Sequence, residues 1–134
     1  MLRYAPLVGR LIFAALFAMA LSFKLMGMGA TAQYIAAAGF PLPFLLAVLA
    51  ALLEAGLLIG FLTAAFFTET ALIAAIYVIF LGFAFHGPSH WQANQDEFGF
   101  FTDHFTFLAG LLFAAAHGPG EVFAPLRRLS LIRR

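Results

Sequence analysis

Four long apolar stretches run along the chain, and short polar segments separate them. They predict membrane spans at about residues 7–26, 43–66, 70–87 and 100–117, the third reaching full length only with its flanking residues. A bilayer core about 30 Å thick requires roughly 20 apolar residues in a helix, and these stretches meet or approach that length. The pattern predicts an all-α fold, a transmembrane four-helix bundle, formed as a single domain by residues 1–134.

Shorter elements are expected between and after these spans. A short interfacial helix is predicted over residues 31–38, with Gly39 as the glycine that ends it. Residues 68–70 predict a tight connection, so that the second and third spans form an antiparallel hairpin. The polar residues 86–99 predict a surface loop, and residues 118–134 predict a basic C-terminal tail.

The hydrophobic share of the composition, 64%, and the charged share, 10%, lie outside the usual range of soluble domains. The net charge is only +1, and the basic residues lie beside apolar segments, so no nucleic-acid partner is indicated. The absence of cysteine excludes disulfides, cysteine-ligated metals and thiolate nucleophiles within this chain. Nucleotide-binding, nucleophile-elbow and zinc-protease motifs are also absent. The sequence therefore gives no case for an enzyme that acts on its own.

Basic residues gather at both ends of the chain, whereas acids gather in the predicted loop before the fourth span. Because cytoplasmic segments are enriched in Lys and Arg, both termini are predicted to be cytoplasmic. The tail is also expected to attract anionic lipid. The basic residues concerned are Arg3, Arg10, Arg127, Arg128, Arg133 and Arg134.

Glu54 is the one ionisable residue in residues 42–67, and it lies near the middle of the second span. A carboxylate at that depth is costly and is a functional-site hypothesis that requires a partner. If the first two spans are antiparallel, Arg10 lies about 9 Å from Glu54 along the membrane normal and Lys24 about 12 Å. Arg10 is therefore the predicted partner, and Lys24 is the alternative.

Other interpretations of these three residues stay open. Arg10 and Lys24 could both extend to opposite interfaces, or at least one could turn inward. An inward pair could simply fix the helix register, or it could take part in proton transfer or ligand binding. Glu54 could also be protonated and bonded to a backbone carbonyl.

Small residues on opposite faces of the second span predict that neighbours pack on both sides. At about 100° per residue, Ala47 and Ala51 share the face of Glu54, while Gly56 and Gly60 lie on the opposite face. The second span is therefore predicted to be an interior helix.

A second group of polar side chains gathers at the predicted outer end. His86, His104, Asp103 and Trp91 are candidates for contact with a ligand or a quinone carbonyl, and Trp91 also suits the aromatic belt. A Gly-Pro pair breaks the helix that would otherwise place His86 and His90 one turn apart, so no metal site is predicted.

Six features occur in order along the chain. They are Arg10 in the first span, Lys24-Leu25, the YIAAAGFPLP segment, Glu54 followed by GLLIG, His86 at the end of the third span, and the final GLLFAAAHGPG. In this order and spacing they resemble the DoxX family of small four-helix membrane proteins. The resemblance implies a multi-pass protein of the cytoplasmic (inner) membrane. The family takes its name from a subunit associated with thiosulfate:quinone oxidoreductase.

Two classes of function follow. The first is an accessory or anchoring subunit of a quinone-linked redox complex, with membrane lipid and other membrane subunits as partners. It would have no intrinsic cofactor, but it could hold a quinone or a bound lipid. The alternative is a protein that binds or transports a small molecule or a proton through Glu54, or a purely structural subunit of a larger membrane assembly.

The predicted topology can be tested by site-specific labelling, because the chain has no cysteine of its own. Single cysteines placed at Ser89 and Ser130 are expected to react with membrane-impermeant reagents from opposite sides of the membrane. Labelling of both positions from the same side would contradict the four-span arrangement.

Overall fold

The computed structural model describes residues 2–132, so Met1, Arg133 and Arg134 lie outside it. Its elements are the 3-10 helix η1 (Leu2–Tyr4), α1 (Ala5–Met26), α2 (Met28–Ala37), α3 (Pro43–Thr63), α4 (Phe67–His86), the 3-10 helix η2 (Pro88–His90) and α5 (Asp96–His117). Helices α1, α3, α4 and α5 are long and apolar enough to cross a membrane. The predicted all-α, four-helix membrane fold is confirmed.

Local sequence signals account for several helix ends. Pro6 lies in the first turn of α1, and Pro43 is the first residue of α3, where a missing N–H costs no helical hydrogen bond. The short helix α2 begins three residues earlier than predicted, at Met28. Gly39 follows its end with a φ of 85°, the left-handed conformation expected of a glycine that ends a helix.

The connection between α3 and α4 lies earlier in the chain than the sequence predicts. Helix α3 ends at Thr63, residues 64–66 form the turn, and residues 68–70 already belong to the first turn of α4. The carbonyl of Thr63 accepts a hydrogen bond from the N–H of Leu126, in the tail. A partner this distant in sequence stabilises the end of α3, which is why the local pattern misplaces it.

Helix α5 also begins before the expected position, at Asp96 rather than near residue 100. Asp96 and Glu97 lie in its first turn, where carboxylates interact favourably with the helix dipole. The side chain of Asn94 accepts a hydrogen bond from the N–H of Asp96. The predicted surface loop is therefore shortened by this first turn and by η2.

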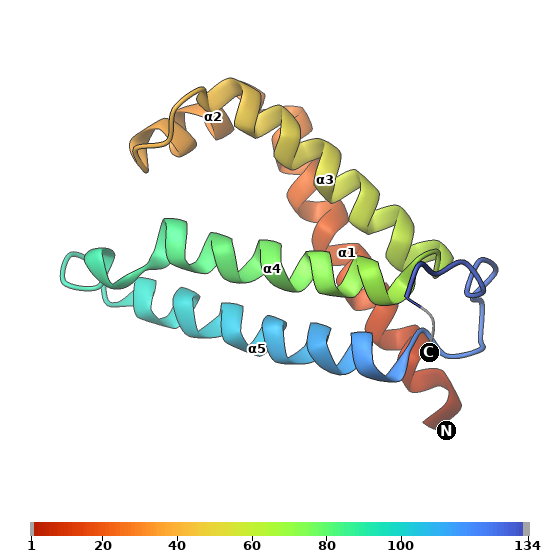
Figure 1. Ribbon diagram of the computed structural model, residues 1–134. Coiled ribbons are helices and arrows are strands. Elements are labelled where there is room, and N and C mark those ends of the chain that lie inside the picture. The colour runs from red at the N-terminus through yellow and green to blue at the C-terminus, as the bar shows by residue number, and fades with distance from the viewer. Residues whose placement is uncertain (1, 133–134) are drawn as a thin grey trace.

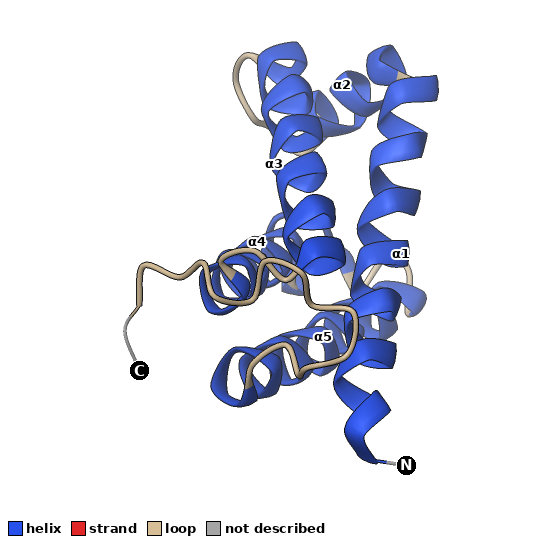
Figure 2. Ribbon diagram, turned by 90° about the vertical axis from the view of Figure 1, so that its right-hand side faces the viewer, coloured by secondary structure: helices blue, strands red, loops and turns tan. Residues whose placement is uncertain are grey.

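The four long helices form two antiparallel pairs, α1 with α3 and α4 with α5, and the pairs cross steeply (Figures 1 and 2). Both ends of the described chain lie at one end of the molecule (Figure 1). The short helix α2 and the loop between α4 and α5 lie at the opposite end. An even number of membrane spans places both ends of a chain on the same side, and this arrangement agrees with that.

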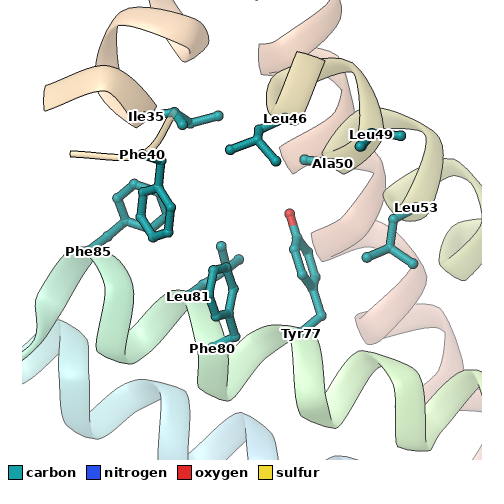
Figure 3. Close-up of a pocket in the computed structure, with 10 residues that line it drawn as sticks. All are labelled: Ile35, Phe40, Leu46, Leu49, Ala50, Leu53, Tyr77, Phe80, Leu81 and Phe85. Atoms are coloured by element: carbon teal, nitrogen blue, oxygen red, sulfur yellow. The ribbon is translucent and has the colours of Figure 1, made fainter. Parts of the chain in front are cut away.

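The predicted hairpin of α3 and α4 is closed only near its turn. Away from the turn the two helices diverge, and α2 covers part of the opening between them (Figure 1). The divergence leaves an apolar cavity of about 330 Å³ between α2, α3 and α4 (Figure 3). The two helices are therefore joined by a short turn but pack against each other only near it.

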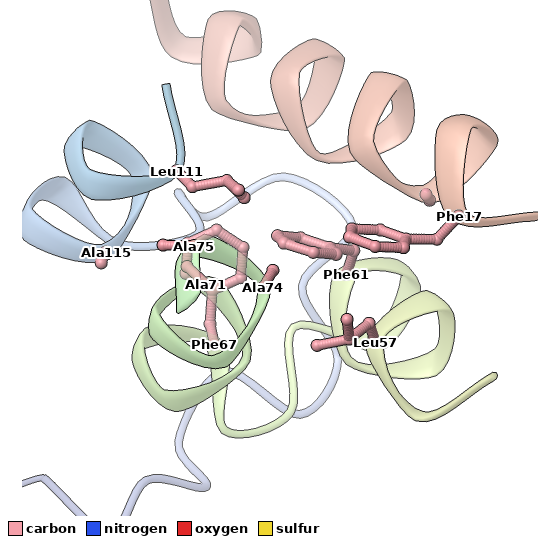
Figure 4. Close-up of a cluster of buried hydrophobic side chains, with 10 residues drawn as sticks. Phe17, Leu57, Phe61, Phe67, Ala71, Ala74, Ala75, Leu111 and Ala115 are labelled. Carbon is pink, nitrogen blue, oxygen red and sulfur yellow. The ribbon is translucent and has the colours of Figure 1, made fainter. Parts of the chain in front are cut away.

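The main core lies at the end where α3 and α4 meet (Figure 4). Phe61 is fully buried there, with its ring stacked on Phe17 at 5.9 Å and meeting Phe67 edge to face at 5.8 Å. Ala71 and Ala75 on α4 are buried in the same cluster. Small side chains at these positions allow close packing of helices.

Gly56 and Gly60, the two glycines predicted to share one face of α3, have different surroundings. A methyl group at Gly60 would overlap the side chain of Thr70, which is itself buried on α4. A methyl group at Gly56 would meet nothing within 4 Å, and this residue is exposed. Of these two glycines, only Gly60 lies where α3 contacts α4.

This difference provides a matched pair of substitutions. Gly60→Ala is expected to destabilise the fold by about 1–3 kcal/mol, because the crowded Thr70 has no free space to enter. Gly56→Ala, the same change on the same helix, is expected to have little effect. Thermal unfolding of both variants in detergent provides the measurement, and equal effects would contradict this packing.

Candidate functional site

Glu54 is buried between three helices, with only 1% of its surface exposed. Its Oε1 atom accepts a hydrogen bond from Lys24 Nζ on α1 at 2.8 Å and another from the Tyr77 hydroxyl on α4 at 2.9 Å. The pair with Lys24 is an ion pair, and the Lys24 side chain is itself only 17% exposed. The prediction that Glu54 faces the bundle is confirmed.

Arg10, the predicted partner of Glu54, binds elsewhere. Its guanidinium donates to the carbonyl of Phe61 at 3.3 Å, to that of Val122 at 2.9 Å and to that of Phe123 at 3.0 Å. The last carbonyls of a helix have no helical partner, and an arginine offers five N–H donors to such groups. The prediction compared only how far Arg10 and Lys24 lie from Glu54 along the membrane normal. It did not consider these carbonyl acceptors, and it therefore selected the wrong basic residue.

The second oxygen of the Glu54 carboxylate, Oε2, is buried and accepts no hydrogen bond from residues 2–132. A buried carboxylate oxygen without a donor is costly in an apolar environment. It leaves one position at this site where a proton or a polar atom of a ligand could bind.

A smaller cavity of about 200 Å³ lies beside the ion pair, and because it adds hydrogen-bonding side chains to an apolar lining we call it the polar cavity. It shares several lining residues with the larger apolar cavity, among them Ala50, Tyr77 and Phe85, so the two cavities adjoin. Figure 3 shows the Tyr77 hydroxyl on the side of the apolar cavity that faces α3. The polar groups that line the smaller cavity are Lys24, Thr31, Tyr34, Tyr77, His86 and His104.

The two histidines in this cavity are positioned by other groups. His86 Nδ1 lies 2.6 Å from Glu97 Oε2, and the rings of His86 and His104 lie 5.3 Å apart. His104 Nδ1 lies 2.6 Å from the carbonyl of Phe100, which only accepts, so this nitrogen carries the proton. In the neutral ring of His104, Nε2 is then the acceptor.

The remaining two candidates, Trp91 and Asp103, line none of the cavities at this end of the molecule. The indole N–H of Trp91 donates to the carbonyl of His86 at 2.9 Å, and its ring packs against Phe98 and Phe101. Trp91 thereby holds the end of α4 against α5. Asp103 is exposed. Within residues 2–132, no three His, Cys, Asp or Glu side chains gather closely enough to hold a metal ion.

Two tyrosines of the site were missed from the sequence. Tyr77 carries the one hydroxyl group in the middle of the third apolar stretch. A polar group at that depth is a signal from which its place in the site could have been predicted. Tyr34 lies in the short helix α2, and its ring stacks on Phe85 at 4.9 Å and lines the smaller cavity. Burial raises the pKa of Tyr34, and the charge of Glu97 raises this pKa further, so its hydroxyl stays protonated at neutral pH.

Comparison with known proteins finds a relative that matches most of the chain. It is 31% identical over 104 residues to the inner membrane protein YphA of Escherichia coli (strain K12), and the match covers 74% of this chain and 72% of that protein. The chain belongs to the YphA family. No family model and no solved structure matches the chain.

Membership of the YphA family agrees with the four membrane-length helices. Together they establish a multi-pass membrane protein related to an inner membrane protein. In a membrane of that kind, the Lys24–Glu54 pair lies within the helices that cross the apolar layer. The cytoplasmic location of the termini stays a prediction from the distribution of basic residues.

A double-substitution experiment tests the ion pair. Lys24→Met is expected to destabilise the protein by about 3–5 kcal/mol, because it leaves a buried carboxylate without its cation. Glu54→Gln is expected to cost less, and the double variant should be more stable than Lys24→Met alone. Thermal unfolding in detergent measures each value, with Arg3→Met as the control for loss of one exposed positive charge. Simple addition of the two single effects would contradict the pairing.

Proposed function

We propose that this protein is a DoxX-type membrane subunit that binds a quinone beside a partner redox enzyme. The observation that carries the proposal is the pair of adjoining cavities, one apolar and aromatic, the other lined by hydrogen-bonding side chains. A quinone has the same two parts, an apolar isoprenoid chain and a flat ring with two carbonyl acceptors. Ligand sites commonly combine an apolar lining with a few placed polar groups in this way.

The apolar cavity suits the ring and the first part of the chain. Phe40, Phe80 and Phe85 contribute aromatic rings, and Phe40 lies 6.0 Å from each of the other two. Leu49 and Leu53 line the side formed by α3 (Figure 3). Rings and branched aliphatic side chains offer a large contact area to a flat apolar molecule.

The polar cavity suits the quinone carbonyls. The Tyr77 hydroxyl and the Lys24 ammonium group both line it and both donate to Glu54. The single proton of the Tyr77 hydroxyl is used there, so Lys24 is the donor that remains for a carbonyl. The Lys24 ammonium carries three N–H donors, of which Glu54 uses one. The other two are available to a carbonyl oxygen.

The role as a subunit rests on the resemblance to the DoxX family and on the lack of cysteine or a haem-attachment motif in the sequence. Electrons for a bound quinone would come from a partner that carries the redox centre. The exposed apolar faces of the spans, including Leu52 and Ile76, can contact lipid or helices of such a partner.

A second function, proton binding or transport through Glu54, is favoured by the unpartnered Oε2 atom. Under this alternative, the purified protein in liposomes would conduct protons, and Glu54→Gln would abolish the flux. Quinone binding without proton flux would instead support the first proposal.

The quinone proposal predicts a specific effect of filling the cavity. Ala50 lines both cavities, so Ala50→Leu is expected to lower co-purified quinone at least about tenfold, because the added side chain occupies the ring position. Ala109→Leu makes the same change at an exposed position on α5 and should retain quinone. Solvent extraction and mass spectrometry of protein purified in mild detergent provide the measurement.

The subunit role needs a separate measurement. Deletion of the protein is expected to reduce both quinone-linked electron transfer and the assembly of the co-purifying complex. Unchanged electron transfer, together with a purified protein that carries neither quinone nor partner, would overturn the proposed function.

A further inference from the structure

The C-terminal tail is held against the helix bundle by charged residues from the helices. The buried side chain of Arg10 on α1 donates to the carbonyls of Val122 and Phe123. The carboxylate of Glu69 on α4 accepts hydrogen bonds from the Ser130 hydroxyl and from the N–H groups of the two residues that follow it. Arg10 on α1 and Glu69 on α4 therefore hold the tail at two points along its length.

Along this course the tail borders an open cavity of about 490 Å³, between the tail, the start of α4 and the end of α5. Three basic side chains line it: Arg127 and Arg128 from the tail and His117 from the last turn of α5. His117 Nδ1 lies 2.9 Å from the carbonyl of Phe113, which only accepts, so this nitrogen donates and the ring is held in place.

The charges around the cavity do not cancel. Glu121 also lines it, but its carboxylate pairs with Arg127 at 3.1 Å. Glu69 does not line the cavity, and its Oε1 atom accepts the hydrogen bonds from the tail. Arg128 makes no hydrogen bond or ion pair within residues 2–132, so its guanidinium remains available to an anion.

We propose that this cavity binds a phosphate group, with Arg128 as the principal contact and Arg127 and His117 beside it. A guanidinium matches two oxygens of a phosphate in a planar, bidentate geometry. The cavity lies at the start of α4 and the end of α5. Because both helices are long enough to cross a membrane, their ends are expected at the level of phospholipid headgroups. The phosphate could belong to an acidic phospholipid or to a soluble phosphate ester.

The first arm of the test compares two arginines at the same end of the molecule. The full chain is placed in nanodiscs of phosphatidylcholine and phosphatidylglycerol, and the lipid retained after transfer to detergent is measured by native mass spectrometry. Arg128→Gln is expected to lower retained phosphatidylglycerol about fivefold relative to wild type. Arg3→Gln removes the same charge from the exposed N-terminal segment, and this variant should retain as much phosphatidylglycerol as wild type. An equal loss in both variants would show diffuse attraction and overturn the site.

The second arm separates the two sources of phosphate. Inorganic phosphate and glycerol 3-phosphate are added to wild type and to Arg128→Gln in a zwitterionic detergent, and the melting temperature is followed. Stabilisation of wild type alone, without selective retention of phosphatidylglycerol, assigns the site to a soluble phosphate ester. Selective retention without such stabilisation assigns it to a phospholipid. If neither ligand distinguishes wild type from Arg128→Gln, and the unliganded melting temperatures agree, the proposal is wrong.

Discussion

The arrangement of the helices depends on the cost of placing the Glu54 carboxylate among apolar side chains. A negative charge at that depth requires a cation and hydrogen-bond donors, which Lys24 and Tyr77 supply from two other helices. The interaction therefore ties α1, α3 and α4 together at one point. The polar cavity lies beside this point, because the same groups that neutralise Glu54 also line the cavity.

Arg10 performs a related task at the other end of α1. It lies among the helices with 3% of its surface exposed, but its partners are backbone carbonyls rather than a carboxylate. It joins the end of α3 to the tail, and Glu69 fixes the tail from α4. The basic residues of the sequence thus have different structural roles. Arg10 and Lys24 are engaged by partners within the bundle, whereas Arg128 makes no hydrogen bond or ion pair within residues 2–132.

The crossing of the two helix pairs connects the fold to the proposed ligand site. Close packing around Phe61 holds α3 and α4 together near their turn, where small side chains allow the helices to approach. At the far end the helices diverge, and rings from α4, together with Phe40 from the loop after α2, line the cavity between them. Side-chain size along α3 and α4 therefore determines both where the bundle is closed and where the cavity of the proposed site lies.

The sequence by itself determined the number of spans, the all-α class and the inward orientation of Glu54. These follow from the length of apolar stretches and from the cost of exposing a charge to hydrocarbon, and both are local properties of the chain. Only the tertiary structure decided which cation meets Glu54, where α3 ends, and that α3 and α4 separate around a cavity. The reason is that each depends on contacts between residues far apart in sequence: Arg10 is drawn to unpaired carbonyls of α3 and the tail, and Lys24 is thereby left for Glu54.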